Sequence, residues 1–213
     1  YTKKLSHQSG WGMMPPANIS NYPIHRLEKS IMSDHIGIST LAVTTDGYVI
    51  ILHQNNKALT SADRLTPSGS GSVDFRDFRA GADFRETLKA AAERELCEET
   101  ALPPCRIGHT EVIGFYRDLG RGGKPEFCCL TRLNAPLFEI SELEPNYEEQ
   151  RDDFETFHIL GKSGQLDGKD FKRFSDMVLN RSPRSEEDRP ALALYMCYIM
   201  LCHYLGKEIT GHS

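Results

Sequence analysis

The sequence predicts a layered α/β domain of the α+β kind, in which a mixed sheet packs between helices. Two apolar runs flank the turn signal Thr45-Asp46-Gly47, which predicts a β-hairpin near the start of the domain. A run rich in helix formers follows, and strand-like and helix-like patterns then alternate toward the C-terminus. The expected strands span 36–44, 48–53, 111–117, 126–133 and 154–160, and the expected helices span 86–99, 171–179 and 186–206.

The helix over 86–99 is predicted from the spacing of its apolar residues. Leu88, Ala91, Ala92 and Leu96 recur three or four positions apart, so they form one stripe that faces a core. Asp83 followed three residues later by Glu86 resembles a capping box with Asp83 as the N-cap, which gives Glu86 a structural role. Pro103-Pro104 ends the helix.

The same helix carries a concentrated group of carboxylates in Arg94-Glu95-Leu96-Cys97-Glu98-Glu99. Glu95, Glu98 and Glu99 stand at i, i+3 and i+4, so they share one helix face. Like charges at this spacing repel, and a hard divalent cation such as Mg²⁺ would offset the repulsion. A solvated acidic face paired with Arg94 is the alternative interpretation.

The wider pattern resembles the Nudix hydrolase box, which is Gly, any five, Glu, any seven, Arg-Glu-aliphatic, any one, Glu-Glu, any one, Gly-aliphatic. The charged box positions are all filled, and the glycines are the two departures. Ala80 stands where the family has its first glycine, and Ala101 stands where it has its second. The positions in register are Glu86, Arg94, Glu95, Leu96, Glu98, Glu99 and Leu102. An alanine forced to positive φ at position 101 would cost about 1–2 kcal/mol, so we expect this helix to end differently from the family's.

The resemblance covers about 36–160 and implies the Nudix-type α/β/α sandwich with extra C-terminal helices. It implies a hydrolase that cleaves the diphosphate linkage of a nucleoside diphosphate derivative, with a nucleotide sugar or ADP-ribose favoured. It also implies Mg²⁺, or Mn²⁺, bound by Glu95, Glu98, Glu99 and the carbonyl of residue 80 (here Ala80). Glu98, Glu99 and Glu95 would be catalytic, with Arg94 as an orienting ion-pair partner. One more carboxylate from the acidic stretch 139–155 could serve as a ligand or general base.

Two further segments are candidates for substrate contacts. The small residues Ser70 and Gly71 precede the helix and would let the backbone approach a phosphate, although a flexible loop is the alternative. Arg117, Arg121 and Lys124 are candidate diphosphate ligands, with an ordinary charged turn as the alternative. For the aromatic residues that follow the glycines or line the next strand, core packing is favoured over stacking on a base. These are Phe75, Phe78, Phe115 and Tyr116.

Two other function classes compete with the hydrolase. A catalytically weak Nudix-like module that senses a nucleotide is favoured by Ala80 and Ala101, and the intact glutamates argue against it. An interaction protein is the second alternative, with the apolar segment 191–206 as its contact surface. Packing of this segment on the domain core is favoured over packing on a second copy of the chain as a homodimer, with Pro190 opening the helix after Ser185 or Asp188 as cap.

Length, net charge and cysteine spacing limit the number of domains, the expected partners and the expected location. The 213 residues suffice for one core, and we divide them into an extended arm at 1–33, a catalytic domain at 34–165 and a helical extension at 166–213. The net charge is −5 without a strong basic block, so neither nucleic acid nor a membrane is an expected partner. The six cysteines form no C-x-x-C pair, and a reducing cytoplasm is the expected location.

Overall fold

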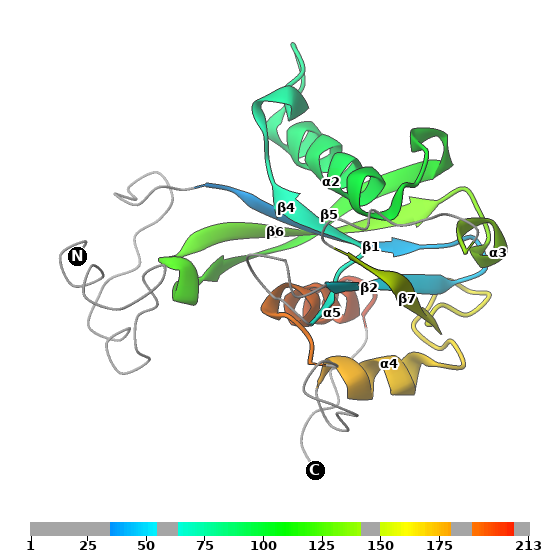
Figure 1. Ribbon diagram of the computed structural model, residues 1–213. Coiled ribbons are helices and arrows are strands. Elements are labelled where there is room, and N and C mark those ends of the chain that lie inside the picture. The colour runs from blue at the N-terminus through cyan, green and yellow to red at the C-terminus, as the bar shows by residue number, and fades with distance from the viewer. Residues whose placement is uncertain (1–34, 55–63, 142–149, 180–188, 207–213) are drawn as a thin grey trace.

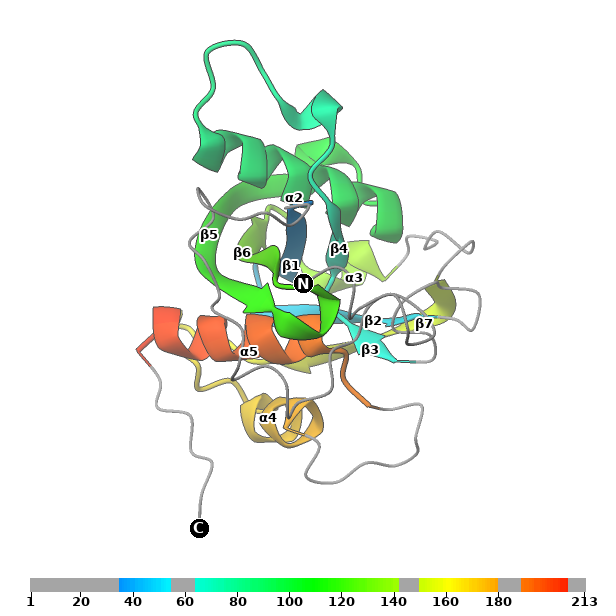
Figure 2. The same cartoon turned by 90° about the vertical axis from the view of Figure 1, so that its left-hand side faces the viewer.

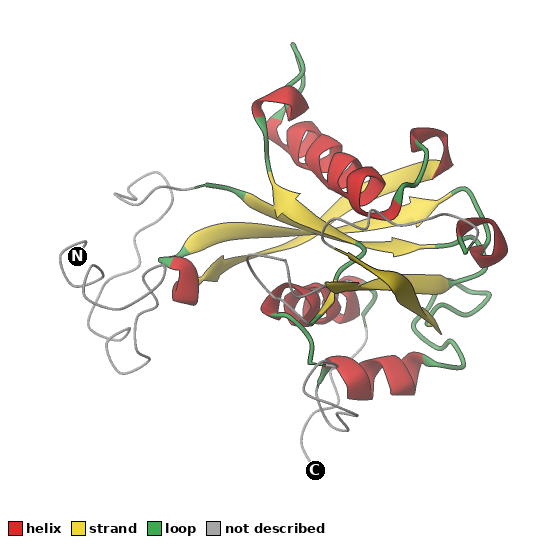
Figure 3. Ribbon diagram, viewed as in Figure 1, coloured by secondary structure: helices red, strands yellow, loops and turns green. Residues whose placement is uncertain are grey.

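A seven-stranded mixed sheet lies between helix α2 on one face and helices α4 and α5 on the other (Figures 1 and 3). The computed structural model describes residues 35–54, 64–141, 150–179 and 189–206. The strands are β1 (Gly37–Val43), β2 (Tyr48–Gln54), β3 (Leu65–Thr66), β4 (Gly69–Ser72), β5 (Ile107–Asp118), β6 (Lys124–Leu133) and β7 (Gln150–His158). The helices are α2 (Phe84–Thr100), α3 (Leu137–Ile140), α4 (Phe171–Val178) and α5 (Leu192–Tyr204), and the 3₁₀ turns are η3 (Phe75–Asp77), η4 (Pro104–Arg106) and η5 (Leu119–Arg121).

The sheet is built around β1, which pairs in parallel with β6 and antiparallel with β2 and β4. The strand order is β3-β2-β1-β6-β5, and β7 pairs with β2. The predicted hairpin therefore exists as β1 and β2, and the predicted α+β layers are confirmed. The strand predicted over 154–160 begins earlier, at Gln150, and ends at His158. The arm predicted for 1–33 lies outside the described residues.

Helix α2 forms as its apolar stripe predicts. Leu88, Ala91, Ala92 and Leu96 are all buried against the sheet. Asp83 is the N-cap, and its carboxylate accepts a hydrogen bond from the Glu86 amide N at 2.9 Å. The helix thus presents one face to the core and leaves its charged residues along the rim of the sheet.

The segment predicted as a Gly/Ser-rich loop is instead two strands, β3 and β4. Strand β4 lies between β1 and α2, and its glycines face the helix. A Cβ atom at Gly69 would lie 2.7 Å from Leu96 Cα, and one at Gly71 would lie 2.2 Å from Glu95 Oε1. A side chain at Gly69 would collide with the α2 backbone, and one at Gly71 would displace the Glu95 carboxylate, so the glycines permit close packing of strand on helix.

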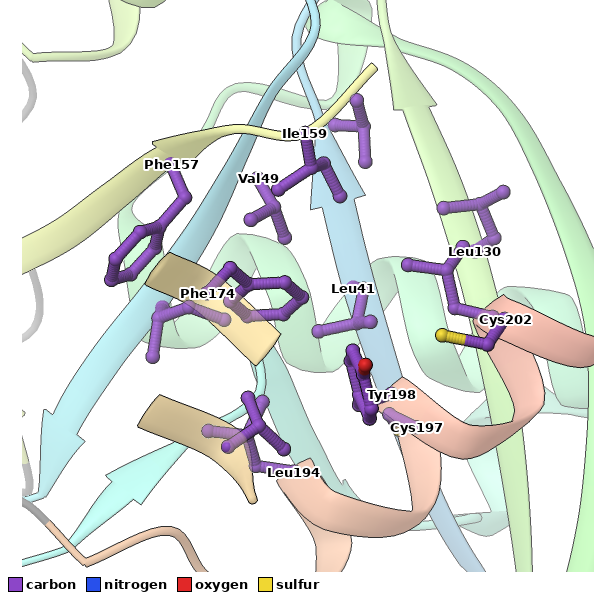
Figure 4. Close-up of a cluster of buried hydrophobic side chains, with 14 of the residues drawn as sticks. Leu41, Val49, Leu130, Phe157, Ile159, Phe174, Leu194, Cys197, Tyr198 and Cys202 are labelled. Atoms are coloured by element: carbon purple, nitrogen blue, oxygen red, sulfur yellow. The ribbon is translucent and has the colours of Figure 1, made fainter. Parts of the chain in front are cut away.

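Helix α5 packs in the main core, as favoured from the sequence. Leu194, Cys197 and Leu201 have no solvent exposure, and the helix lies against β1, β5 and β6 (Figure 4). A buried hydrogen bond of 2.7 Å joins the Tyr198 hydroxyl to Ser175 of α4. One face of α5 is thus part of the core, whereas Leu192, Tyr195 and Tyr204 remain exposed, so the interaction-protein alternative stays a prediction.

The start of α5 differs from the expected one. The helix begins at Leu192 with Ala191 as N-cap and without a capping side chain, and the expected caps Ser185 and Asp188 lie outside the described residues. No helix among the described residues is long and apolar enough to cross a membrane. All six cysteines lie in the described part of the chain, and none of them forms a disulfide bond.

Candidate active site

Arg94 is the centre of the charged cluster on α2. Its Nη1 donates to Glu95 Oε1 at 2.8 Å and to Glu98 Oε2 at 3.0 Å. Its Nε and Nη2 donate to the two carboxylate oxygens of Asp77 at 2.8 and 3.0 Å, and Nη2 also donates to the Ser72 carbonyl at 2.8 Å. The hydrogen bonds with Asp77, followed by those with Glu95, raise the pKa of Arg94 further above its ordinary value. One guanidinium therefore fastens α2 to both β4 and η3.

Glu95 is more enclosed than Glu98, the other box glutamate that contacts Arg94. Its side chain is 14% exposed, and Oε1 also accepts a hydrogen bond from the Ser72 amide N at 3.2 Å. Burial raises the pKa of Glu95, and the hydrogen bond and charge of Arg94 oppose that shift. Glu95 thus links helix to strand while one carboxylate face stays beside Gly71, where a Cβ atom would collide with it.

Glu98 is the accessible carboxylate of the cluster, with 45% of its side chain exposed. Its Oε2 accepts from Arg94, and its Oε1 lies 3.2 Å from Nη1 of Arg76, which is itself 59% exposed. An exposed ion pair of this kind is weak and exchanges easily with another ligand. Glu99 is half-buried at the next position along α2. Glu98 is therefore best placed to meet a molecule that arrives from solvent.

The predicted metal ligands were tested against this geometry. Among the described residues, no group of three or more His, Cys, Asp or Glu side chains is arranged to hold a metal ion. The reason is visible in the contacts, since Glu95 and Glu98 both turn toward Arg94. The donors themselves are carboxylate oxygens, which suit Mg²⁺, and Glu95 Oε1 occupies the space that a Cβ atom at Gly71 would take. The donor chemistry fits a divalent cation once the contacts of Glu95 and Glu98 with Arg94 and Arg76 are exchanged.

Ala80, the residue at the position of the family's first glycine, does not lie on β4. It is exposed in the turn between η3 and α2. The backbone that reaches the glutamates is that of β4, at Gly69 and Gly71. The predicted contact residues Ser70 and Gly71 belong to this strand, which pairs them with Ser39 and Ile38 of β1. In this chain the segment that contains η3 and Ala80 is therefore inserted between strand β4 and helix α2.

The three predicted phosphate-binding cations gather on the β5–β6 hairpin, where they have partners in the protein. Glu126 Oε1 lies 2.8 Å from Lys124 Nζ and 3.4 Å from Arg121 Nη1, and Arg117 Nε donates to the Gly123 carbonyl at 2.6 Å. Glu126 is buried, 6% exposed, and was not singled out from the sequence. These contacts fit the alternative of a structured charged turn.

The burial of Glu126 could be predicted from the sequence only if the pairing of β1 with β6 were already known. Gly37 of β1 stands beside Glu126 in the parallel register, and a Cβ atom at Gly37 would lie 1.8 Å from its Oε2. A glycine within an apolar strand thus marks the space for a charged neighbour.

The acidic stretch yields no further carboxylate at this cluster within the described residues. Residues 142–149 lie outside the described part, and Glu155 Oε1 lies 3.5 Å from His53 Nε2, on strands β7 and β2. A cavity of about 380 Å³ is also remote from α2. It is lined by Thr44, Asp46 and Arg132 among others, at the end of β1 opposite to the end that pairs with Ser72.

Asp77 of η3 was missed from the sequence, and Phe75 and Phe78 beside it differ from expectation in their exposure. Asp77 is 4% exposed and holds Arg94, whereas Phe75 and Phe78 are 89% and 56% exposed. Core packing, the role favoured for these two phenylalanines, is therefore wrong. The signal was a repeat, Asp74-Phe75-Arg76 followed by Asp77-Phe78-Arg79, whose first and fourth positions cap and anchor the turn.

Comparison with known proteins gives a result at the level of fold. No protein-family model matches the chain, and no curated protein sequence does. A crystal structure of a NUDIX hydrolase from Alicyclobacillus acidocaldarius is similar with a TM-score of 0.52 at 8% identity, covering 83% of this chain and 93% of that one. DR0079 from Deinococcus radiodurans has a TM-score of 0.40 at 14% identity, covering 70% and 89%. A MutT protein from Methanosarcina mazei Go1 has a TM-score of 0.38 at 17% identity, covering 70% and 96%.

The first of these likenesses spans most of both chains, and the layers described above agree with it. At 8% identity this similarity is evidence for the fold and not for a reaction. The mixed sheet, with the glutamate-bearing helix α2 packed on one face, agrees with this similarity. We conclude that this chain has a Nudix-type fold.

Proposed function

We propose that the chain is a pyrophosphohydrolase that cleaves the diphosphate linkage of a nucleoside diphosphate derivative, with nucleotide sugars and ADP-ribose as the favoured class. The observation that carries this proposal is the position of Glu95, Glu98 and Glu99 on α2 of a Nudix-type fold, around an arginine held by a buried aspartate. Three carboxylates gathered at the edge of a sheet repel an anionic substrate unless a cation accompanies it.

Mg²⁺, or Mn²⁺, would be held by Glu95, Glu98 and Glu99, and when bound would neutralise phosphate oxygens and lower the pKa of attacking water. The accessible Glu98 is the candidate to accept the proton of that water. Arg94 positions Glu98 and Glu95 through its Nη1, so it acts on the carboxylates rather than on the substrate. Arg76 is the exposed cation that leaves Glu98 when substrate arrives.

The sensor alternative draws its support from the two replaced glycines. Ala101 has φ = 57° and ψ = 17°, so the helix ends in the left-handed conformation that the family glycine would adopt. Gly69 and Gly71 supply the close backbone approach on β4 that Ala80 does not. The helix end and the close approach of β4 to α2 are therefore kept despite both departures, which supports the enzyme over the sensor.

The test is a screen of nucleoside diphosphate derivatives and nucleoside triphosphates, with Mg²⁺ and with excess chelator, read by phosphate release or mass spectrometry. We expect turnover of one class that disappears with chelator. Glu98→Gln and Glu99→Gln should each lower kcat by about 100-fold or more because general base or ligand contributions are of that size. Glu93→Gln, at a free position of the box on the same helix, is the matched control. A near-normal kcat in the Glu98 and Glu99 variants would refute the assignment.

The location and partners follow from the same proposal. The substrate is a small molecule, and we propose action in a reducing compartment, the cytoplasm, which suits a chain whose six cysteines form no disulfide within the described residues.

A further inference from the structure

We propose that Phe75 and Phe78 form a stacking subsite for the nucleobase of the substrate, at the rim of the carboxylate cluster. This subsite rests on the proposed function for its substrate and on separate observations for its position. Figure 2 shows the segment between β4 and α2, which contains η3, standing over α2 on the solvent side. The ligand class is a planar heteroaromatic ring attached to a diphosphate.

The residues of the 3₁₀ turn η3 point to different sides and make different contacts. Such a turn has three residues per turn, so Phe75 and Phe78 share one side, and Arg76 and Asp77 take the other two. Asp77 points inward and is bound by Arg94, and Arg76 reaches Glu98 at 3.2 Å. The two phenyl rings are left facing solvent, with centroids 6.4 Å apart and planes 35° apart. The turn therefore places two aromatic faces next to the residue that contacts Glu98.

The turn is also held rigidly, which distinguishes it from a mobile hydrophobic loop. Asp74 caps η3 by accepting a hydrogen bond from Arg76 N at 3.1 Å, and its own amide N donates to Asp77 Oδ2 at 2.7 Å. With the two bonds from Arg94, the backbone and the anchor side chain are fixed before any ligand arrives. A fixed aromatic surface binds without the cost of ordering a loop.

A ligand with a flat apolar face would cover these two exposed rings and remove apolar surface from water. An apolar ring that is 89% exposed contributes little to stability, and a second exposed ring beside it makes an apolar patch. An arginine follows each ring in the sequence, Arg76 after Phe75 and Arg79 after Phe78. A nucleobase suits this surface because every base has a π-face, and its phosphates suit cations and a metal-bearing carboxylate cluster. A diphosphate at Glu98 would thus direct its nucleoside toward η3.

The experiment compares binding of ADP and of inorganic pyrophosphate to the full chain by isothermal titration calorimetry with Mg²⁺. Pyrophosphate is the probe that has the diphosphate without the base. The variant is Phe75→Ala with Phe78→Ala, and the matched control is Phe138→Ala, since Phe138 is 66% exposed on α3. We expect the double variant to weaken ADP binding about 5- to 150-fold, and pyrophosphate binding to stay unchanged in both variants. Phe75→Trp with Phe78→Trp should restore ADP affinity.

The outcomes separate this inference from the proposed function. Base-dependent ADP binding without turnover of any diphosphate derivative would support the subsite and reject the hydrolase. Turnover with equal ADP affinity in wild type and double variant would reject the subsite and leave the hydrolase standing. Equal losses for ADP and pyrophosphate would mean that the rings only hold the turn in place, and would also overturn the subsite. Thermal unfolding of the double variant should match wild type, because both side chains are exposed.

Discussion

The buried carboxylate of Asp77 allows a quantitative test of how η3 is held to α2. Its Oδ1 accepts from Arg94 Nε at 2.8 Å, and its Oδ2 accepts from Arg94 Nη2 at 3.0 Å and from the Asp74 amide N at 2.7 Å. In Asp77→Asn one oxygen becomes an NH₂ group, so at least one of these three donors would face another donor. Removing one partner of a buried ion pair costs about 3–5 kcal/mol. Because Asn can keep part of the hydrogen bonding, we expect a loss of about 3 kcal/mol.

Urea unfolding at neutral pH measures this loss. The free energy of unfolding should fall by about 3 kcal/mol with an unchanged m value. For a chain of 213 residues the same loss lowers Tm by about 6–12 °C. Asp74→Asn is the control, because Asp74 is 51% exposed and asparagine caps a helix as well as aspartate does. The control should change stability by less than about 0.5 kcal/mol.

The pH dependence gives a second, independent reading. Burial pushes the pKa of Asp77 upward, but the hydrogen bonds and charge of Arg94 prevail and hold it below its ordinary value. The stability that Asp77 contributes is therefore full above the unfolded pKa of about 3.9 and is lost as the pH falls through the lower folded pKa. The gap between wild type and Asp77→Asn should close only in strong acid. A gap under about 1 kcal/mol at neutral pH, or one that persists at the acid limit, would refute the role assigned to this pair.

Two further predictions concern the ends of helices and the core. Ala101→Gly should stabilise the protein by about 0.5–1 kcal/mol, since relief of the left-handed alanine outweighs the added freedom of the unfolded glycine; a lower Tm would contradict this. Leu201→Ala should lower the free energy of unfolding by about 2–5 kcal/mol because the side chain is fully buried. Leu192→Ala, 47% exposed on the same helix, should change it by less than about 0.5 kcal/mol, and equal effects of the two would argue against the packing of α5.

Local patterns in the sequence were sufficient for much of the fold. The stripe of α2, its N-cap Asp83 and the β1–β2 hairpin all depend on residues within a few positions of one another, and all three were predicted. The left-handed conformation at Ala101 was not predicted, because the cost of positive φ for an alanine led us to expect a different end to this helix, yet Ala101 adopts φ = 57°. The apolar character of 191–206 indicated burial, which the contacts of α5 confirm.

The features that were missed depend on contacts between distant residues. The Gly/Ser segment reads as a loop until β1 and α2 are placed on either side of it, because only then do Gly69 and Gly71 become packing positions. Asp77 lies seventeen positions before Arg94, so their ion pair has no helical spacing to reveal it. The exposure of Phe75 and Phe78 likewise follows from where that ion pair holds η3. Strand pairing and the Asp77–Arg94 ion pair, rather than the local preferences of the residues, therefore determine these parts of the site.

The position of α5 also has a consequence for the order in which the chain can fold during synthesis. Leu41 of β1 and Leu201 of α5 belong to one buried cluster, although 160 positions separate them in the sequence. The ribosome releases the chain from its N-terminus, so β1 emerges well before α5 and this cluster can close only after α5 has emerged. Contacts of such long range slow folding and leave apolar strands uncovered in the meantime. A nascent chain of this protein therefore depends on α5 to become native, and protection by chaperones matters most until α5 has left the ribosome.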